Sequence, residues 1–269
     1  MISFKISSFQ NNLIKEVVSL QVKSKERKRQ NLIPIEGKKE ISLAVKGGVA
    51  IQKIFYCPEI INYSEVCEII GSDKIENIVV CEVTADVFSK ISYRETTGGI
   101  IAIANPKGKT LKDLKPTGNS VYIILESVEK PGNLGAICRV ADAAKVDAVI
   151  ICDELTDIYN PNSIRSSLGC VFTIDVVNAD FKETIEWLKN ENITSYAAEL
   201  TAAEFYQDVD FGGNIALVFG TEATGLTKNW LSNADKRIKI PMRGVIDSLN
   251  VTTSVAILVF EAMRQRNFN

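Results

Sequence analysis

Three short polar segments in the second half of the sequence hold residue types from which a binding or catalytic site can be built. They are Glu126–Gly135, which precedes Arg139, then Gly220–Leu226, then the stretch from Ile240 through Ser248 to Asn250. Each follows an apolar run typical of a buried strand, and ligands of parallel sheets bind beyond the carboxyl ends of strands. Glycine, serine and asparagine beside charged residues suit a site that offers backbone groups to a ligand.

Some kinds of chemistry are excluded by what the sequence lacks. It contains no histidine, so histidine acid–base catalysis and histidine metal sites do not apply. No GxGxxG or GxxxxGK[ST] pattern occurs, which leaves ordinary dinucleotide and P-loop sites unsupported. The six cysteines lie scattered in apolar runs without CxxC spacing, which indicates reduced core residues. We therefore expect no metal site.

The elements that position the polar segments form an α/β domain. Near-continuous apolar strands predict a mostly parallel sheet with helices on both faces. The strands are expected at Val121–Leu125, Ala148–Cys152, Val171–Val176, near Tyr196, at Ile215–Phe219 and at Arg237–Ile240. A helix is expected over Ala136–Lys145 with Asn133 as its cap, and Asp180 should cap another that ends at Lys189.

The last helix begins after Asn250, whose side chain is a good N-cap. It is rich in β-branched residues and apolar on nearly every face, so packing on two sides must stabilise it. We expect one of those sides to face a partner subunit.

The first half of the chain alternates shorter strands and helices, which predicts a small α/β domain over residues 1–105. Residues 106–119 hold prolines, glycines and lysines with little apolar content and are expected to be a linker. The second domain then spans residues 120–269. The dense cations from Lys23 to Arg29 suit either a solvated helix face or a phosphate-contacting patch.

Composition supports a folded protein: 269 residues, 46% hydrophobic and 24% charged, with a net charge of −2. The slight negative charge argues against nonspecific attraction of the whole protein to a polyanion. The sequence shows neither a signal pattern nor an apolar run of membrane-spanning length. We expect a cytoplasmic protein that does not enter a membrane.

The ordered segments resemble the three motifs of the SpoU (TrmH-like) branch of SPOUT RNA methyltransferases. The matching stretches are Pro-Gly-Asn-Leu-Gly-Ala-Ile-Cys-Arg at 131–139, Phe-Gly-Thr-Glu-Ala-Thr-Gly-Leu at 219–226, and Ile-Pro-Met at 240–242 through Ser-Leu-Asn-Val at 248–251. Residues 35–37 and 97–102 resemble parts of the L30e-like substrate-binding domain that precedes many ribosomal-RNA members. Lys130 departs from the pattern, which commonly has Asp or Asn there.

The resemblance implies a ribose 2′-O-methyltransferase that uses S-adenosyl-L-methionine, releases S-adenosyl-L-homocysteine and requires no metal. It also implies a carboxyl-terminal trefoil knot around the cofactor and a homodimer through the second domain. RNA, most readily ribosomal RNA, is the expected substrate. Two alternatives remain: an inactive RNA-binding protein of the same fold, and a transfer-RNA ribose methyltransferase.

The same resemblance assigns candidate residues. The catalytic candidates are Arg139, Asn133, Glu222, Asn250 and Ser248. Cofactor binding is expected through backbone groups at Gly220, Ile240 and Leu249, with Met242 and Ala198 nearby. RNA contacts are expected at Arg27, Arg29, Lys38 and Arg94, with Lys107 a further candidate.

Several roles stay open. Arg139 either loses its own proton in a special site, or orients the ribose and adjacent phosphate while the proton leaves by another route. Glu222, Asp247 and the RNA phosphate are the other acceptors in reach of such a site. Ser248 either contacts the substrate or stabilises its turn, and Glu222 either pairs with a cation or shapes the second segment.

Overall fold

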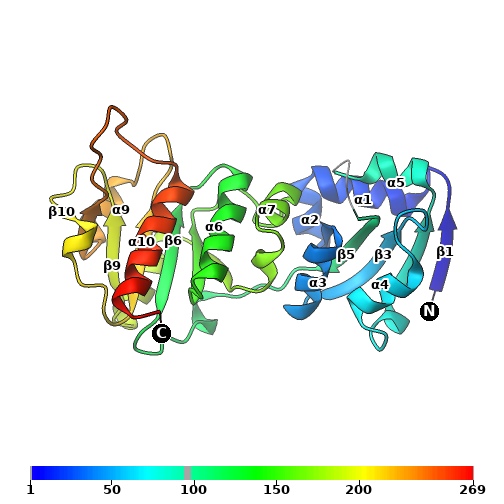
Figure 1. Ribbon diagram of the computed structural model, residues 1–269, viewed down its shortest axis with the longest axis horizontal. Helices are drawn as coiled ribbons and strands as arrows, with labels where there is room; N and C mark the ends of the chain where they lie inside the picture. The colour runs from blue at the N-terminus through cyan, green and yellow to red at the C-terminus, as the bar shows by residue number, and fades with distance from the viewer. Residues whose placement is uncertain (1, 94–97, 269) are drawn as a thin grey trace. The chain divides into compact units, whose positions relative to one another are not determined.

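Residues 2–93 and 98–268 are described by a computed structural model, and they divide into two compact units (Figure 1). The first unit comprises Met1–Lys107 and Ile158–Thr173. The second comprises Gly108–Asp157 and Ile174–Asn269. Residues 158–173 therefore pack with the first unit although both flanking segments belong to the second.

The first unit is built on a five-stranded mixed sheet. Its strand order is β1 (Ile2–Ile6), β4 (Val79–Val83), β3 (Ala50–Tyr56), β5 (Ile100–Asn105) and β2 (Ile33–Glu36). The first three strands run parallel to one another, whereas β5 runs antiparallel to both β3 and β2.

Helices cover both faces of this sheet. On one face α1 (Asn12–Val22) and α5 (Ala85–Ile91) bury their apolar sides against the strands. Helix α1 begins where the Asn11 side chain accepts a hydrogen bond from Leu13 N at 2.9 Å, a standard N-cap. Helices α3 (Lys38–Lys46) and α4 (Tyr63–Ile70) pack together, and the short α2 (Ser24–Gln30) follows α1.

The segment 158–173 contributes α7 (Pro161–Ser166) and the 3-10 turn η3 (Cys170–Phe172) to the first unit. Helix α7 contacts β2, and η3 contacts α3. Val171 and Phe172 are buried there. The strand expected at Val171–Val176 is therefore wrong: its apolar residues pack on a helix, and the strand β8 covers only Val176–Ala179.

The second unit contains a seven-stranded, wholly parallel sheet. Its order is β10 (Glu204–Phe205), β12 (Lys236–Lys239), β9 (Thr194–Ala198), β11 (Ile215–Phe219), β6 (Val121–Glu126), β7 (Ala148–Cys152) and β8. The central strands β6, β7 and β11 are buried at every residue, as near-continuous apolar runs require.

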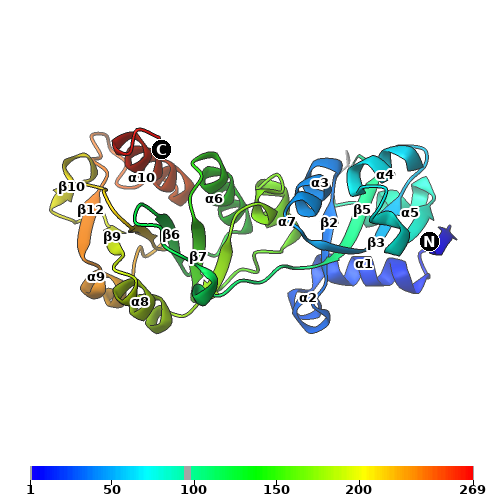
Figure 2. The same cartoon turned by 90° about the horizontal axis from the view of Figure 1, so that it is seen from below.

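Helices lie on both faces of this sheet (Figure 2). Helices α6 (Pro131–Ala143) and α10 (Val251–Gln265) pack side by side on one face, whereas α8 (Phe181–Asn190) and α9 (Lys228–Asn233) cover the other. Asn250 caps α10 as expected, since its Oδ1 accepts from Thr252 N at 2.9 Å. Asp180 likewise caps α8, accepting from Glu183 N at 2.9 Å.

The cap expected at Asn133 is wrong. Helix α6 begins five residues earlier than expected, with Pro131 in the first turn and Lys130 at the N-cap position. Asn133 is thus inside the helix, and its side chain is available to make contacts elsewhere.

Within residues 2–93 and 98–268, no helix is both long and apolar enough to cross a membrane. All six cysteines are reduced, as the sequence indicates.

Arg266, just beyond α10, anchors the end of that helix to the loops that lead into the sheet. It is 8% exposed, and Nη2 donates to the carbonyl oxygens of Phe211 and Gly213, both at 2.6 Å. Nη1 donates to the Asn119 side chain at 2.8 Å and also to the Asn119 carbonyl.

We predict that Arg266→Ala lowers the free energy of unfolding by about 2–3 kcal/mol, because buried carbonyls lose charged donors. Arg29→Ala is the matched control: Arg29 is 63% exposed and pairs with Glu26, so its loss should cost about 0.5 kcal/mol or less. Urea denaturation followed by circular dichroism measures both. Equal effects of the two substitutions would contradict the anchoring role.

Candidate functional site

Glu222 joins the three polar segments. Its Oε1 accepts hydrogen bonds from the side-chain amides of Asn133 and Asn250, each at 2.7 Å. Its Oε2 accepts from the Lys130 ammonium group. Asn250 also donates to Asn133 Oδ1 at 3.3 Å. The carboxylate therefore ties the start of α6, the loop after β11 and the start of α10 into one cluster.

The loop after β11 folds tightly enough to need glycine. Thr221 and Gly225 exchange backbone hydrogen bonds of 3.1 and 3.0 Å, and Gly225 adopts φ +68°. A Cβ on Gly220 would lie 2.2 Å from the backbone of Gly225, so no larger residue fits there. The hairpin-like loop presents Glu222 at its tip.

The far end of this loop is fixed to β6. Glu126, the last residue of β6, is 3% exposed, and its carboxylate accepts from Thr227 N at 2.8 Å and Thr227 Oγ1 at 2.7 Å. Because β6 also leads into α6, this buried carboxylate keeps the first and second segments in register. This role of Glu126 was not predicted from the sequence, although an acidic residue at the end of an apolar strand is a signal for it.

A cavity of about 420 Å³ opens at the carboxyl ends of β9, β11 and β12. Its lining includes all five residues expected to bind the cofactor, Ala198, Gly220, Ile240, Met242 and Leu249, together with the catalytic candidates Glu222 and Ser248. Its size suits a small-molecule ligand.

A smaller cavity of about 210 Å³ adjoins the first. The two share Thr221, Glu222, Ala223 and Val251, and the smaller one adds Lys130 and Asn133 from the start of α6. The Glu222 cluster thus lies where the two cavities meet.

Arg139 stands apart from both cavities. It is exposed on α6, six residues beyond Asn133. Six residues rotate a side chain by about 240° and advance it by about 9 Å, so Arg139 and Asn133 lie on different faces of the helix. Within one chain, then, Arg139 does not join the Glu222 cluster.

The residues expected to contact RNA differ in exposure and in the partners they already have. Arg27 is 4% exposed and donates to the carbonyl of Leu20 at 2.6 Å, so its burial argues against a phosphate contact. Arg29 and Lys38 reach the surface, paired with Glu26 and Glu65. Arg94 lies outside the described residues, and Lys107 donates to the carbonyl of Gly47.

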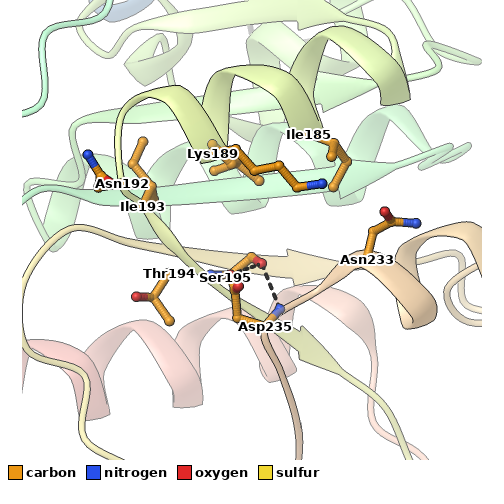
Figure 3. A pocket seen from close by; sticks show the side chains of 9 residues that line it. Ile185, Lys189, Asn192, Ile193, Thr194, Ser195, Asn233 and Asp235 are labelled. Carbon is orange, nitrogen blue, oxygen red and sulfur yellow. Dashed lines mark hydrogen bonds between the residues drawn. The ribbon is translucent and has the colours of Figure 1, made fainter.

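A third cavity, of about 350 Å³, lies at the opposite end of the sheet (Figure 3). It is lined by Thr194 and Ser195, at the amino end of β9, and by Lys189 and Asp235. Ser195 and Asp235 form hydrogen bonds with each other: Asp235 Oδ2 accepts from Ser195 N at 2.8 Å and from Ser195 Oγ at 2.7 Å. The polar groups of Ser195 and Asp235 are therefore already hydrogen-bonded, which makes this cavity a weaker candidate for a ligand site than the cavity beside Glu222.

Two of the cysteines are deeply buried. Burial raises the pKa of Cys81 to about 11 and that of Cys152 to about 12, which leaves both thiols protonated and unreactive at neutral pH. In the part of the chain that the structure describes, no group of three or more cysteine, aspartate or glutamate side chains could hold a metal ion.

Comparisons with known proteins show the family of the chain. Residues 120–260 match the SpoU rRNA Methylase family, and residues 11–102 match the MRM3-like substrate binding domain. The chain belongs to the SpoU rRNA methylase family.

SpoU relatives match along nearly the whole chain. The 23S rRNA (guanosine(2553)-2′-O)-methyltransferase RlmP of Bacillus subtilis is 30% identical over 95% of this chain and 98% of its own. A crystal structure of an AdoMet-bound rRNA methyltransferase from Sinorhizobium meliloti is 28% identical with a TM-score of 0.90, over 97% of this chain and 98% of its own. A structure described as an RNA 2′-O ribose methyltransferase is 34% identical with a TM-score of 0.84, over 98% and 100%.

In this SpoU protein the hydrogen bonds of the Glu222 cluster should change the pKa of Glu222, which a titration can measure. Hydrogen bonding from Lys130, with Asn133, the Lys130 charge and Asn250 contributing, lowers the pKa of Glu222. A carboxyl group with a lowered pKa stabilises the fold above the ordinary glutamate pKa of about 4.3, and that contribution is lost as the pH falls through the lowered value.

We predict that Lys130→Ala raises the pKa of Glu222 towards the ordinary value, because the largest stabilising contact of the carboxylate is removed. Carbon-detected NMR of the Glu222 side chain measures the midpoint in both proteins. Lys228→Ala, an exposed lysine on α9 that lines neither cavity, is the control and should leave it unchanged. An identical midpoint in the Lys130 variant would show that the ion pair does not form in solution.

Proposed function

We propose that this protein transfers a methyl group from S-adenosyl-L-methionine to the 2′-hydroxyl of a ribose in ribosomal RNA. The observation that carries the proposal is the meeting of the three motif segments at Glu222, beside a cavity lined by every expected cofactor-binding residue. Relatives over nearly the full chain are named as 2′-O-methyltransferases of 23S rRNA, which supports the ribosomal substrate.

The larger cavity fits the cofactor. Ala198, Gly220 and Ile240 follow or end neighbouring strands, where backbone groups leave the sheet and can bond to adenine. Gly220 allows the close backbone approach that a flat base requires. S-adenosyl-L-methionine supplies an electrophilic methyl group, and no metal takes part in this proposal.

The Glu222 carboxylate positions groups and does not act as the base. Three donors occupy its oxygen atoms and its pKa is lowered, so it holds a proton weakly. In this role Glu222 fixes the amides of Asn133 and Asn250, which can then orient the ribose. Ser248, which donates to Asp247 at 3.2 Å and lines the cavity, contacts the substrate.

A homodimer through the carboxyl-terminal domain supplies the missing arginine. Thr253, Phe260 and Arg264 are exposed on α10, and Phe260 is 41% exposed although large and apolar. Arg139 is exposed on α6, the helix beside it, and away from its own cluster. We propose that this face meets a second copy and that Arg139 of the partner subunit orients the ribose and its phosphate.

The remaining proposals follow from the family and the charge pattern. Residues 1–105 form the L30e-like RNA-binding domain, and residues 106–119 link it to the SPOUT domain, which spans residues 120–269 and contains the trefoil knot. Within that last range, residues 158–173 pack with the first unit, and residues 108–119 of the linker pack with the second. Arg29, Lys38 and Arg94 contact RNA phosphates. The protein acts in the cytoplasm, where ribosomal RNA is found.

The function is tested by incubating the purified protein with radiolabelled S-adenosyl-L-methionine and unmodified ribosomal RNA. We expect label in alkali-resistant dinucleotides, which mark a methylated 2′-hydroxyl. Cofactor binding without transfer to any RNA would favour an inactive RNA-binding protein. Label in transfer RNA but not in ribosomal RNA would contradict the proposed substrate.

The shared site is tested by mixing two inactive variants. Arg139→Ala and Asn133→Ala should each lose transfer while still binding the cofactor. After subunit exchange, a mixed dimer combines the intact Asn133 of one chain with the intact Arg139 of the other, and about a quarter of wild-type activity should return.

Unmixed samples of each variant, taken through the same exchange, are the controls. If mixing restores nothing although mass spectrometry shows mixed dimers, Arg139 acts within its own chain or not at all.

A further inference from the structure

Glu199 is an unassigned acidic residue in the cofactor cavity. It follows β9 directly, and its backbone N–H donates to the carbonyl of Ile238 at 2.9 Å, which continues the pairing of β9 with β12. Its side chain is 17% exposed, and the residue lines the larger cavity beside Ala198. Its position is therefore fixed by the sheet.

The two carboxylate oxygens of Glu199 are unequally satisfied. Oε1 accepts from Thr201 Oγ1 at 2.6 Å. Oε2 is buried and accepts no hydrogen bond from any described residue. The nearest cation, Nη1 of Arg237, is 3.7 Å from Oε2, within ion-pair range but beyond hydrogen-bond distance. A buried oxygen without a donor is costly, and a ligand in the cavity can supply one.

The sheet order places Glu199 away from the reacting end of the site. Strand β11 lies between β9 and β6, and β6 leads into α6 with Asn133. At about 4.8 Å per strand, the ends of β9 and β6 are roughly 10 Å apart. The transferred methyl group must face Asn133 and Glu222, so Glu199 meets a part of the cofactor that does not react.

The ion pair with Arg237 bears on which donor Glu199 can accept. Arg237 already offsets the charge of the Glu199 carboxylate, with Nη1 at 3.7 Å from Oε2. Among the described residues, Oε2 therefore lacks a hydrogen-bond donor but has a neighbouring positive charge, and neutral hydroxyl groups can supply the donor without adding a second cation.

We propose that Glu199 accepts hydrogen bonds from the ribose hydroxyls of the adenosine moiety of the cofactor, an inference that rests on the proposed function. It makes Glu199 a binding residue that selects for an intact ribose. Because the contact is equally present before and during methyl transfer, its loss raises KM and leaves kcat nearly unchanged.

Isothermal titration calorimetry with three probes tests this. All three probes contain adenine. S-adenosylhomocysteine has both ribose hydroxyls and the amino-acid arm, and 5′-methylthioadenosine has both ribose hydroxyls but no amino-acid arm. 2′,3′-Dideoxy-5′-methylthioadenosine has neither the ribose hydroxyls nor the amino-acid arm. Glu199→Ala should weaken the binding of the first two probes equally, by about 10- to 100-fold, and should leave the affinity for the third unchanged. Glu199→Gln, which keeps the shape and loses the charge, should weaken the first two by about tenfold.

Glu204→Gln is the matched control, because Glu204 is exposed on β10 and does not line the cavity. Thermal denaturation checks that each variant is folded. Weaker binding of S-adenosylhomocysteine alone would place the ammonium group at Glu199 and overturn the inference. Unchanged binding of both ribose probes would also overturn it. If the wild-type protein binds none of them, the proposed function itself fails.

Discussion

The geometry of the candidate site depends on one carboxylate. Glu222 accepts hydrogen bonds from Asn133, Asn250 and Lys130, which come from segments separated by up to 120 positions in the chain. Each segment leaves or enters the parallel sheet at the same edge, so the fold brings them near one another but does not by itself fix their side chains. The charged carboxylate of Glu222 fixes these side chains, because an ionised carboxylate offers several acceptor sites and binds amide and ammonium donors strongly.

The surrounding structure keeps that carboxylate in place. Gly220 lets the loop turn back on itself, and Glu126 holds the end of the same loop against β6. Asn250 both caps α10 and contacts Glu222, so a single side chain couples the start of a helix to the site. These contacts leave the lining of the larger cavity preorganised, which reduces the entropic cost of binding a flexible cofactor.

Much of this arrangement could be predicted from the sequence. Apolar runs such as Ile215–Phe219 predict the parallel strands, and the capping roles of Asn250 and Asp180 follow from side-chain chemistry. The cap at Asn133 was wrong because Pro131 allows the helix to begin earlier, and the strand at Val171 was wrong because its apolar residues pack on α3. The exposed two-residue strand β10 and the short α9 carry too little periodicity to be found. The contacts of Glu222 with Asn133 and of Glu199 with Arg237 link residues distant in sequence, and residue types alone do not fix such geometry.

The most direct measurement is a crystal structure of the protein with S-adenosylhomocysteine. The account predicts that the adenosine lies in the cavity bounded by Ala198, Gly220, Ile240 and Leu249, with the sulfur atom facing Asn133 and with Glu222 still bonded to both asparagines. A ligand bound elsewhere in the chain, or a Glu222 side chain turned away from Asn133 and Asn250 in the complex, would contradict it.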